Sequence, residues 1–334
     1  MHNPPFTVSA AFVRGMLSAC CADGNSADAW LLAAGISPAL IAQASGRVTA
    51  EQYVALFGVV MAHCNDEALG FFSRPLRNGT IALAMRSALT ASTVESATRR
   101  LCRALALVQD DVQFDTITDE HLTGVRIIVP SAYAPDRLFV HELLLRVLSR
   151  LIVWLHGGRL RPHGVDFTYA SPPHADEYHK LFPGRVRFNQ PQSAVWFPTA
   201  KLMAPMRRDN AALHAYMLQS PRNVVIPQRN EDSTSERIRA HLQQVRPQWP
   251  DLPATADALN MSVSTLQRHL ASEGSSFQLV KDHLRRDLAI MRLNTSTVQL
   301  AALAAELGFS DQAVFQRAFK TWTGSAPGTY RQRT

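Results

Sequence analysis

Two Gln-Arg pairs, Gln267–Arg268 and Gln316–Arg317, are the residues whose types and spacing point most directly to chemistry in this sequence. In the major groove of DNA, Gln can form two hydrogen bonds with adenine and Arg can form two with guanine. Each pair lies in a segment whose apolar residues recur every three to four positions, which predicts a helix with the pair on its outer side. The two pairs therefore indicate recognition of DNA bases.

Each pair belongs to a copy of one pattern, a short helix followed by a polar turn and a second helix. The copies span residues 254–270 and 303–319. This is the helix-turn-helix pattern, present twice. When the pairs are aligned, Leu266 falls on Phe315, Leu270 on Phe319, Ala258 on Leu307 and Ala256 on Ala305.

The predicted turns contain the residue types that end one helix and begin the next. Asn260 and Gly308 can adopt the positive φ that terminates a helix. Ser262 and Ser310 follow two residues later, where a hydroxyl can cap the second helix. We therefore expect both turns to have the same local structure.

The side chains expected to contact DNA lie on the outer face of a second helix or at its N-terminus. Arg268 and Gln267 are expected to read one major-groove segment, and Arg and Gln side chains of the second copy the next. Hydroxyl groups and helix N-termini suit phosphates. The full set is Ser262, Ser264, Thr265, Gln267 and Arg268 in the first copy, and Ser310, Asp311, Gln312, Gln316 and Arg317 in the second.

A third helix is predicted between the two copies, over residues 277–294. About 17 residues at 1.5 Å each give a rod of roughly 25 Å. Such a rod can hold two readers about one DNA turn apart, roughly 34 Å. The competing interpretation is a helical bundle whose Gln-Arg pairs are merely solvated surface.

The composition is that of a globular protein with two domains. The chain has 334 residues, of which 46% are hydrophobic and 18% charged, with a net charge of +7 that favours a polyanionic partner. The basic residues are mostly arginine, a skew that DNA binding or a GC-rich genome would equally produce. Nothing at the N-terminus predicts a secretory signal, and the expected location is the cytoplasm.

The predicted fold is an α+β N-terminal domain followed by an all-α DNA-binding domain with two helix-turn-helix units joined by a long helix. The domain boundaries are 1–218 for sensing or dimerisation, 219–235 for a linker with two prolines, and 236–334 for DNA binding. The helix at 138–155 carries four ionisable side chains, which argue against a bilayer span and favour a buried helix or a dimer seam. The other N-terminal elements are helices at 10–34, 49–63 and 80–108, a hairpin at 111–118 and 121–129, and strands at 164–169, 185–188 and 194–197.

Other chemistry finds little support in the residues. There is no nucleotide-binding or zinc-binding motif, so no cofactor, no metal site and no catalytic residue is predicted. Effector-binding residues stay unassigned, and buried thiols are preferred over a thiol sensor at Cys20–Cys21. Four histidines are interpreted as loop residues on a solvated surface and not as metal ligands: His156, His163, His174 and His179. Seven aromatic residues are interpreted as core and strand-face packing in preference to the lining of an apolar effector pocket: Trp154, Tyr169, Tyr178, Phe182, Phe188, Trp196 and Phe197.

The last hundred residues closely resemble the C-terminal signature of AraC/XylS-type transcriptional regulators. The resemblance rests on LAALAAELGFSDQAVFQRAFKTWTGSAPGTYR at 300–331, and on Gly274, Phe277, Arg285 and Ala289 before it. Residues 29–210 resemble the effector domain of the arabinose-binding-like subgroup, without a jelly roll and without implying a sugar. One departure is Val263–Ser264, small where some members carry a bulky aromatic residue, which leaves the base preference of that helix open.

The resemblance implies a transcription factor and not an enzyme. Its partners would be double-stranded promoter DNA and RNA polymerase, with activation as the expected sign of regulation. A small-molecule effector and a homodimer are compatible with the N-terminal domain, and a membrane is not a partner. The alternatives are a metabolite-binding protein or enzyme with an accessory nucleic-acid-binding tail, and a non-specific packaging protein.

Overall fold

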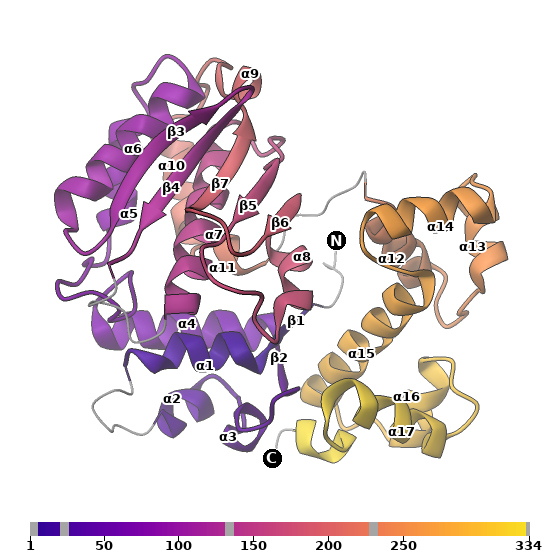
Figure 1. Ribbon diagram of the computed structural model, residues 1–334. Helices are drawn as coiled ribbons and strands as arrows, with labels where there is room; N and C mark the ends of the chain where they lie inside the picture. The colour runs from indigo at the N-terminus through magenta and orange to yellow at the C-terminus, as the bar shows by residue number, and fades with distance from the viewer. Residues whose placement is uncertain (1–5, 21–26, 131–136, 227–232, 332–334) are drawn as a thin grey trace. The chain divides into compact units, whose positions relative to one another are not determined.

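A computed structural model describes residues 6–20, 27–130, 137–226 and 233–331 (Figure 1). By their contacts the residues form two units. The sheet unit consists of Ala11–Ala34 and Val54–Pro227, and the helical unit of Met1–Ala10, Gly35–Tyr53 and Gln228–Thr334. The boundaries proposed at 218 and 236 remain a prediction.

The sheet unit is built on five strands in the order β3-β4-β7-β5-β6. The expected hairpin forms from β3 and β4, with Glu120 at a φ of 44° in its turn. All neighbouring strands pair antiparallel except β5 and β6, which are parallel. The strands are β3 Gln113–Asp119, β4 Leu122–Ile128, β5 Gly164–Asp166, β6 Arg185–Arg187 and β7 Ser193–Pro198.

Helices of the sheet unit cover this sheet and extend its core. The segment expected as one helix at 80–108 is two, because Thr93 and Ser96 form a reciprocal capping box that begins a new helix. The helices are α1 Ala10–Ser18, α2 Asp28–Ala33, α4 Ala50–Cys64, α5 Thr80–Ala88, α6 Val94–Val108, α7 Arg137–Leu155, η1 Ala175–Glu177, α8 Tyr178–Leu181, α9 Thr199–Leu202, α10 Asn210–Leu218 and α11 Arg222–Val225.

The helix α7 is buried, as its apolar sequence predicts, and contacts β4, β7, α6 and α11. Glu142, Arg146 and Arg150 lie on one of its faces and are each less than 10% exposed. No helix among the described residues is long and apolar enough to cross a membrane.

Part of the segment predicted to be a linker is helical. Arg146 Nε donates to the carbonyl of Val224 at 2.8 Å, and Arg150 Nε donates to the carbonyl of Asn223 at 2.7 Å. These two contacts from α7 hold the short helix α11 in place. The polar sequence around it gives no sign of this, because the partners lie about 75 residues earlier in the chain.

The helical unit contains the C-terminal helices and a small two-stranded sheet that the sequence did not predict. The strands β1 Thr7–Ser9 and β2 Arg47–Thr49 pair antiparallel, with α3 Pro38–Ile41 nearby in the chain. Thr7 Oγ1 donates to Asp287 at 2.5 Å, and Gln52 Nε2 donates to Asn294 at 2.9 Å. The C-terminal elements are α12 Thr234–Gln244, α13 Leu252–Ala258, α14 Val263–Ser272, α15 Phe277–Thr295, α16 Leu300–Glu306, α17 Gln312–Thr323 and η2 Pro327–Tyr330.

Candidate nucleic-acid interface

The first predicted helix-turn-helix forms from α13 and α14. Asn260 takes the expected positive φ, at 56°. The amide of Met261 donates to the carbonyl of Ala256 at 3.0 Å and closes the end of α13. Ser262 then caps α14, its hydroxyl accepting from the amide of Thr265 at 3.2 Å. The predicted turn is confirmed here.

The second unit, α16 and α17, repeats this geometry. Gly308 has a φ of 73°, and the amide of Phe309 donates to the carbonyl of Ala304 at 3.0 Å. A Cβ atom on Gly308 would lie 2.4 Å from Trp249 Cδ1, so glycine serves both the backbone and the packing at this position.

The sequence predicts Ser310 as the cap of α17, and this prediction is wrong. The residue that caps α17 is Asp311. The Asp311 carboxylate accepts from the amide of Val314 at 2.8 Å, and the Ser310 hydroxyl donates to Asp311 Oδ2 at 3.2 Å. The amide of Val314 lowers the pKa of Asp311 below its ordinary value. A carboxylate thus occupies the helix N-terminus that a phosphate would otherwise use.

One additional residue in the second turn changes the alignment of the first helices. Asn260 and Gly308 correspond at an offset of 48, whereas Leu266 and Phe315 correspond at 49. The buried Ala256 therefore matches the buried Ala304. The sequence alignments of Ala256 with Ala305 and of Ala258 with Leu307 are wrong for this reason.

The side chains predicted to contact DNA do face outward on α14 and α17. Beneath them Leu266, Leu270, Phe315 and Phe319 are fully buried and anchor both helices in the core. Thr265 and Gln316 are half-buried. The other eight are exposed: Ser262, Ser264, Gln267, Arg268, Ser310, Asp311, Gln312 and Arg317.

The helix α15 separates the two readers. It has 19 residues, which corresponds to a length of about 28 Å. Figure 1 shows α13 and α14 at one end of it and α16 and α17 at the other. The structure therefore brings each predicted set of contacts together within its own unit and keeps the two sets apart.

A stacked cluster that the sequence did not single out ties the second unit to α15. The Arg285 guanidinium lies 4.9 Å from the ring centres of both Trp249 and Phe309. Trp249 Nε1 also donates to the carbonyl of Glu306 at 3.0 Å. Burial lowers the pKa of Arg285. Because Phe309 lies in the turn before α17, this cluster fixes the direction of the second reader.

Charge is also buried inside the helical unit. Asp287 on α15 is completely buried and pairs with Arg239 at 2.6 Å and with Arg286 at 3.1 Å. The amide of Arg47 on β2 donates to the hydroxyl of Tyr330 at 3.2 Å. The small sheet therefore shares its polar contacts with the same core that supports the readers.

The remaining histidines, cysteines and aromatic residues lie in different environments, with His163 and His179 exposed and Cys20 half-buried. His174 Nε2 lies 2.8 Å from Glu142 Oε1, and no three His, Cys, Asp or Glu side chains of the described residues gather where a metal ion could sit. Cys21 is outside the described residues, and Cys20 Sγ lies 3.2 Å from Cys64 Sγ. Tyr178, Phe182 and other aromatic residues of the predicted set stack on one another around Phe167 as core.

Two regions of the chain match known families. Residues 24–206 match the family described as the arabinose-binding domain of AraC transcription regulator, N-terminal. Residues 255–333 match a helix-turn-helix domain.

Some similar regulators match this chain over nearly their whole length. The ornithine utilization regulator of Pseudomonas aeruginosa is 27% identical over 97% of this chain and 96% of its own length. A urease operon transcriptional activator of Escherichia coli is 26% identical over 58% of this chain and 67% of its own. The crystal structure of the transcriptional regulator CdpR from Pseudomonas aeruginosa is 20% identical with a TM-score of 0.34, covering 92% of this chain and 96% of that one.

Proposed function

The chain belongs to the AraC family of transcription regulators, and from this premise we propose that both helix-turn-helix units read one operator together. Arg268 and Gln267 read bases in one major-groove segment, and Arg317, Gln316 and Gln312 in the next. Ser262, Ser264, Thr265 and Ser310 contact phosphates, while Asp311 acts as the cap of its helix.

The observation that carries this proposal is the matched presentation of the two Arg side chains. Arg268 and Arg317 occupy equivalent positions on α14 and α17, each one residue after a Gln, and both are exposed. Each helix is anchored by two fully buried apolar side chains, so the outer face has a fixed direction. An outward Arg on a fixed helix is the arrangement that reads guanine.

The regulation belongs to the same proposal. Activation is supported by the likeness to a urease operon transcriptional activator, and we propose that it acts through contact with RNA polymerase. A homodimer would double the number of readers on a palindromic operator. The protein would act in the cytoplasm, where it meets promoter DNA.

The test begins with selection of bound duplexes from a random library by the full-length chain. On the selected sequence, Arg268→Ala and Arg317→Ala should each weaken binding by about 1–3 kcal/mol. The loss on unrelated DNA should be much smaller, because base contacts are absent there.

The matched control is Arg103→Ala, which removes an exposed Arg from α6 in the sheet unit. Its binding should equal that of the unaltered chain. An equal loss on selected and unrelated DNA for both reader variants would indicate phosphate contacts alone and would support a packaging protein instead.

A further inference from the structure

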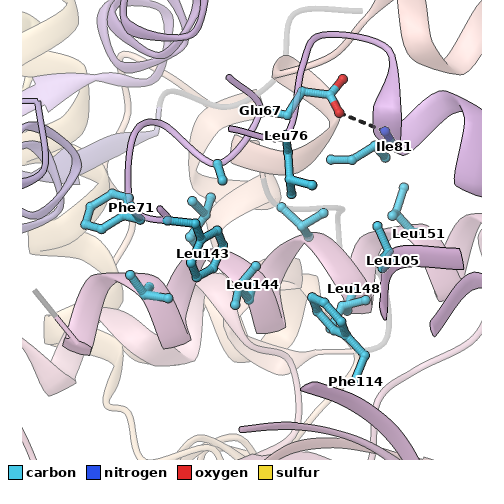
Figure 2. A pocket seen from close by; sticks show the side chains of 14 residues that line it. Glu67, Phe71, Leu76, Ile81, Leu105, Phe114, Leu143, Leu144, Leu148 and Leu151 are labelled. Carbon is cyan, nitrogen blue, oxygen red and sulfur yellow. Dashed lines mark hydrogen bonds between the residues drawn. The ribbon is translucent and has the colours of Figure 1, made fainter. Parts of the chain in front are cut away.

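The sheet unit contains an apolar pocket whose walls come from segments far apart in the sequence. It has about 530 Å³ of space, including its open mouth, between α7, α6, β3 and the segment that follows Glu67 (Figure 2). Fourteen residues line it, and all except Glu67 are apolar. Most of this space lies in the open mouth, so the enclosed part has room for a small ligand only.

The floor of the pocket is one face of α7. Leu144, Val147, Leu148 and Leu151 lie on this face at helical spacing, and Figure 2 shows labelled leucines of α7 directed into the space. Leu144 and Val147 remain only half-buried, while the opposite face of the same helix buries Arg146 and Arg150. A helix that leaves aliphatic side chains incompletely covered while it buries guanidinium groups is not arranged for packing alone.

Glu67 is the one polar side chain in the lining, and its carboxylate is already in use. It accepts from the amide of Gly79 at 2.8 Å and from the amide of Ile81 at 2.7 Å, at the start of α5. Figure 2 shows this carboxylate turned toward Ile81. Burial raises the pKa of Glu67 above its ordinary value. The carboxylate thus holds the wall of the pocket and offers little to a ligand.

We propose that this pocket binds a small uncharged apolar molecule, aliphatic or with a single aromatic ring, as the effector of the protein. The inference rests on the proposed function, because it takes the sheet unit to be the part that senses a signal. It names the chemical class of that signal.

The lining disfavours the polar ligands that the names of similar proteins suggest. A sugar would bring several hydroxyl groups to a wall with no polar partner besides Glu67, and each unpaired hydroxyl would weaken binding. Ornithine carries charged groups at both ends, and burying them without partners is costlier still. An apolar ligand gains contacts with thirteen apolar side chains and leaves no polar group unpaired.

The test uses 4-(dimethylamino)benzonitrile, an uncharged dye with a single aromatic ring whose fluorescence changes on leaving water, with the full-length chain. The dye should bind, and n-alkanols or alkylbenzenes should displace it. Val147→Phe places a larger side chain in the pocket and should weaken dye binding by about tenfold or more. The matched control is Leu107→Phe, because Leu107 on α6 is 77% exposed and outside the lining.

Each outcome decides the proposal. The proposal is overturned if dye binding survives Val147→Phe, or if a chain that melts cooperatively binds no dye. It is also overturned if ornithine or arabinose displaces the dye and alkylbenzenes do not. Binding of both variants to the selected operator duplex is measured in parallel. Retained DNA binding with no apolar ligand would reject the pocket alone and leave the proposed function intact. Loss of specific DNA binding by the unaltered chain would reject the proposed function itself.

Discussion

Equivalent positions in the two turns use different residues for one conformation. Asn260 and Gly308 both adopt a positive φ, but only Gly308 lies against Trp249. Asn tolerates the left-handed region through its short polar side chain, whereas a side chain at 308 would also collide with an indole ring.

These two positions should therefore respond differently to substitution. Gly308→Ala should lower the free energy of unfolding by about 1–3 kcal/mol, since Ala is strained at positive φ and its Cβ meets Trp249. Asn260→Gly, at the matched position, should change it by less than about 1 kcal/mol. Urea unfolding of both variants gives the comparison, and equal effects would contradict it.

A second residue-scale feature is the carboxylate of Glu273, which follows α14 and binds the start of α12. It accepts from the amide of Thr234 at 2.6 Å and the amide of Ser235 at 3.0 Å, and from two hydroxyl groups. Burial alone would raise the pKa of Glu273, but these hydrogen bonds outweigh burial and lower it.

The lowered pKa predicts a pH dependence of stability. A group whose folded pKa is depressed stabilises the fold fully above the ordinary Glu pKa of about 4.3, and this contribution is lost as the pH falls further. Glu273→Gln should therefore have a lower melting temperature than the unaltered chain near neutral pH, and this difference should narrow as the pH falls below about 5. Asp257→Asn, at an exposed position on α13, should show no such narrowing. A gap constant with pH would argue against this role of Glu273.

At the scale of elements, α7 joins the apolar pocket to the end of the sheet unit. The pocket lies against one of its faces, and on the other Arg146 and Arg150 hold the backbone of α11. Burial, reinforced by the charge of Arg150, lowers the pKa of Arg146 to about 9. Since α11 ends two residues before the sheet unit does, α7 holds the last helix of that unit.

Removal of one of these contacts should loosen α11 alone. Arg150→Leu breaks the hydrogen bond to the carbonyl of Asn223, and the amides of Val224, Val225 and Ile226 should exchange with solvent about tenfold faster. Arg159→Leu, at an exposed position after α7, is the matched control. Hydrogen exchange followed by mass spectrometry measures both. Unchanged exchange at 224–226 would show that α11 does not depend on Arg150.

The elements that the sequence predicted well are those whose signals are local. The second helices of both units follow from apolar spacing, and both turns from Asn260 and Gly308. The strands β1 and β2 were missed because three-residue strands depend on partners far away in the sequence, such as Asp287 for Thr7. The pocket was missed for the same reason, since its walls come from α6, β3 and α7 and no segment alone indicates it.

At the scale of the whole molecule, chain order and spatial grouping differ. Residues 35–53 lie within the N-terminal half of the sequence but group with the DNA-binding helices. Two helices, α1 and α4, begin in the helical unit and end in the sheet unit. The chain therefore passes between the two units more than once, in α1 and α4 as well as after α11.

The rigid connection between the two readers makes a prediction about the operator. Because α15 carries both units and Arg285 fixes the second between Trp249 and Phe309, the spacing of the readers cannot adjust freely. The two base segments should lie about 10.5 base pairs apart on one face of the duplex.

Insertion of about five base pairs between them turns the second segment to the opposite face. Affinity should then fall to that of a single reader, and Arg317→Ala should cause no further loss on the altered duplex. Fluorescence anisotropy with the original and the lengthened duplex measures both effects. If Arg317→Ala still weakens binding to the lengthened duplex as strongly as to the original, the readers move independently and α15 does not set their spacing.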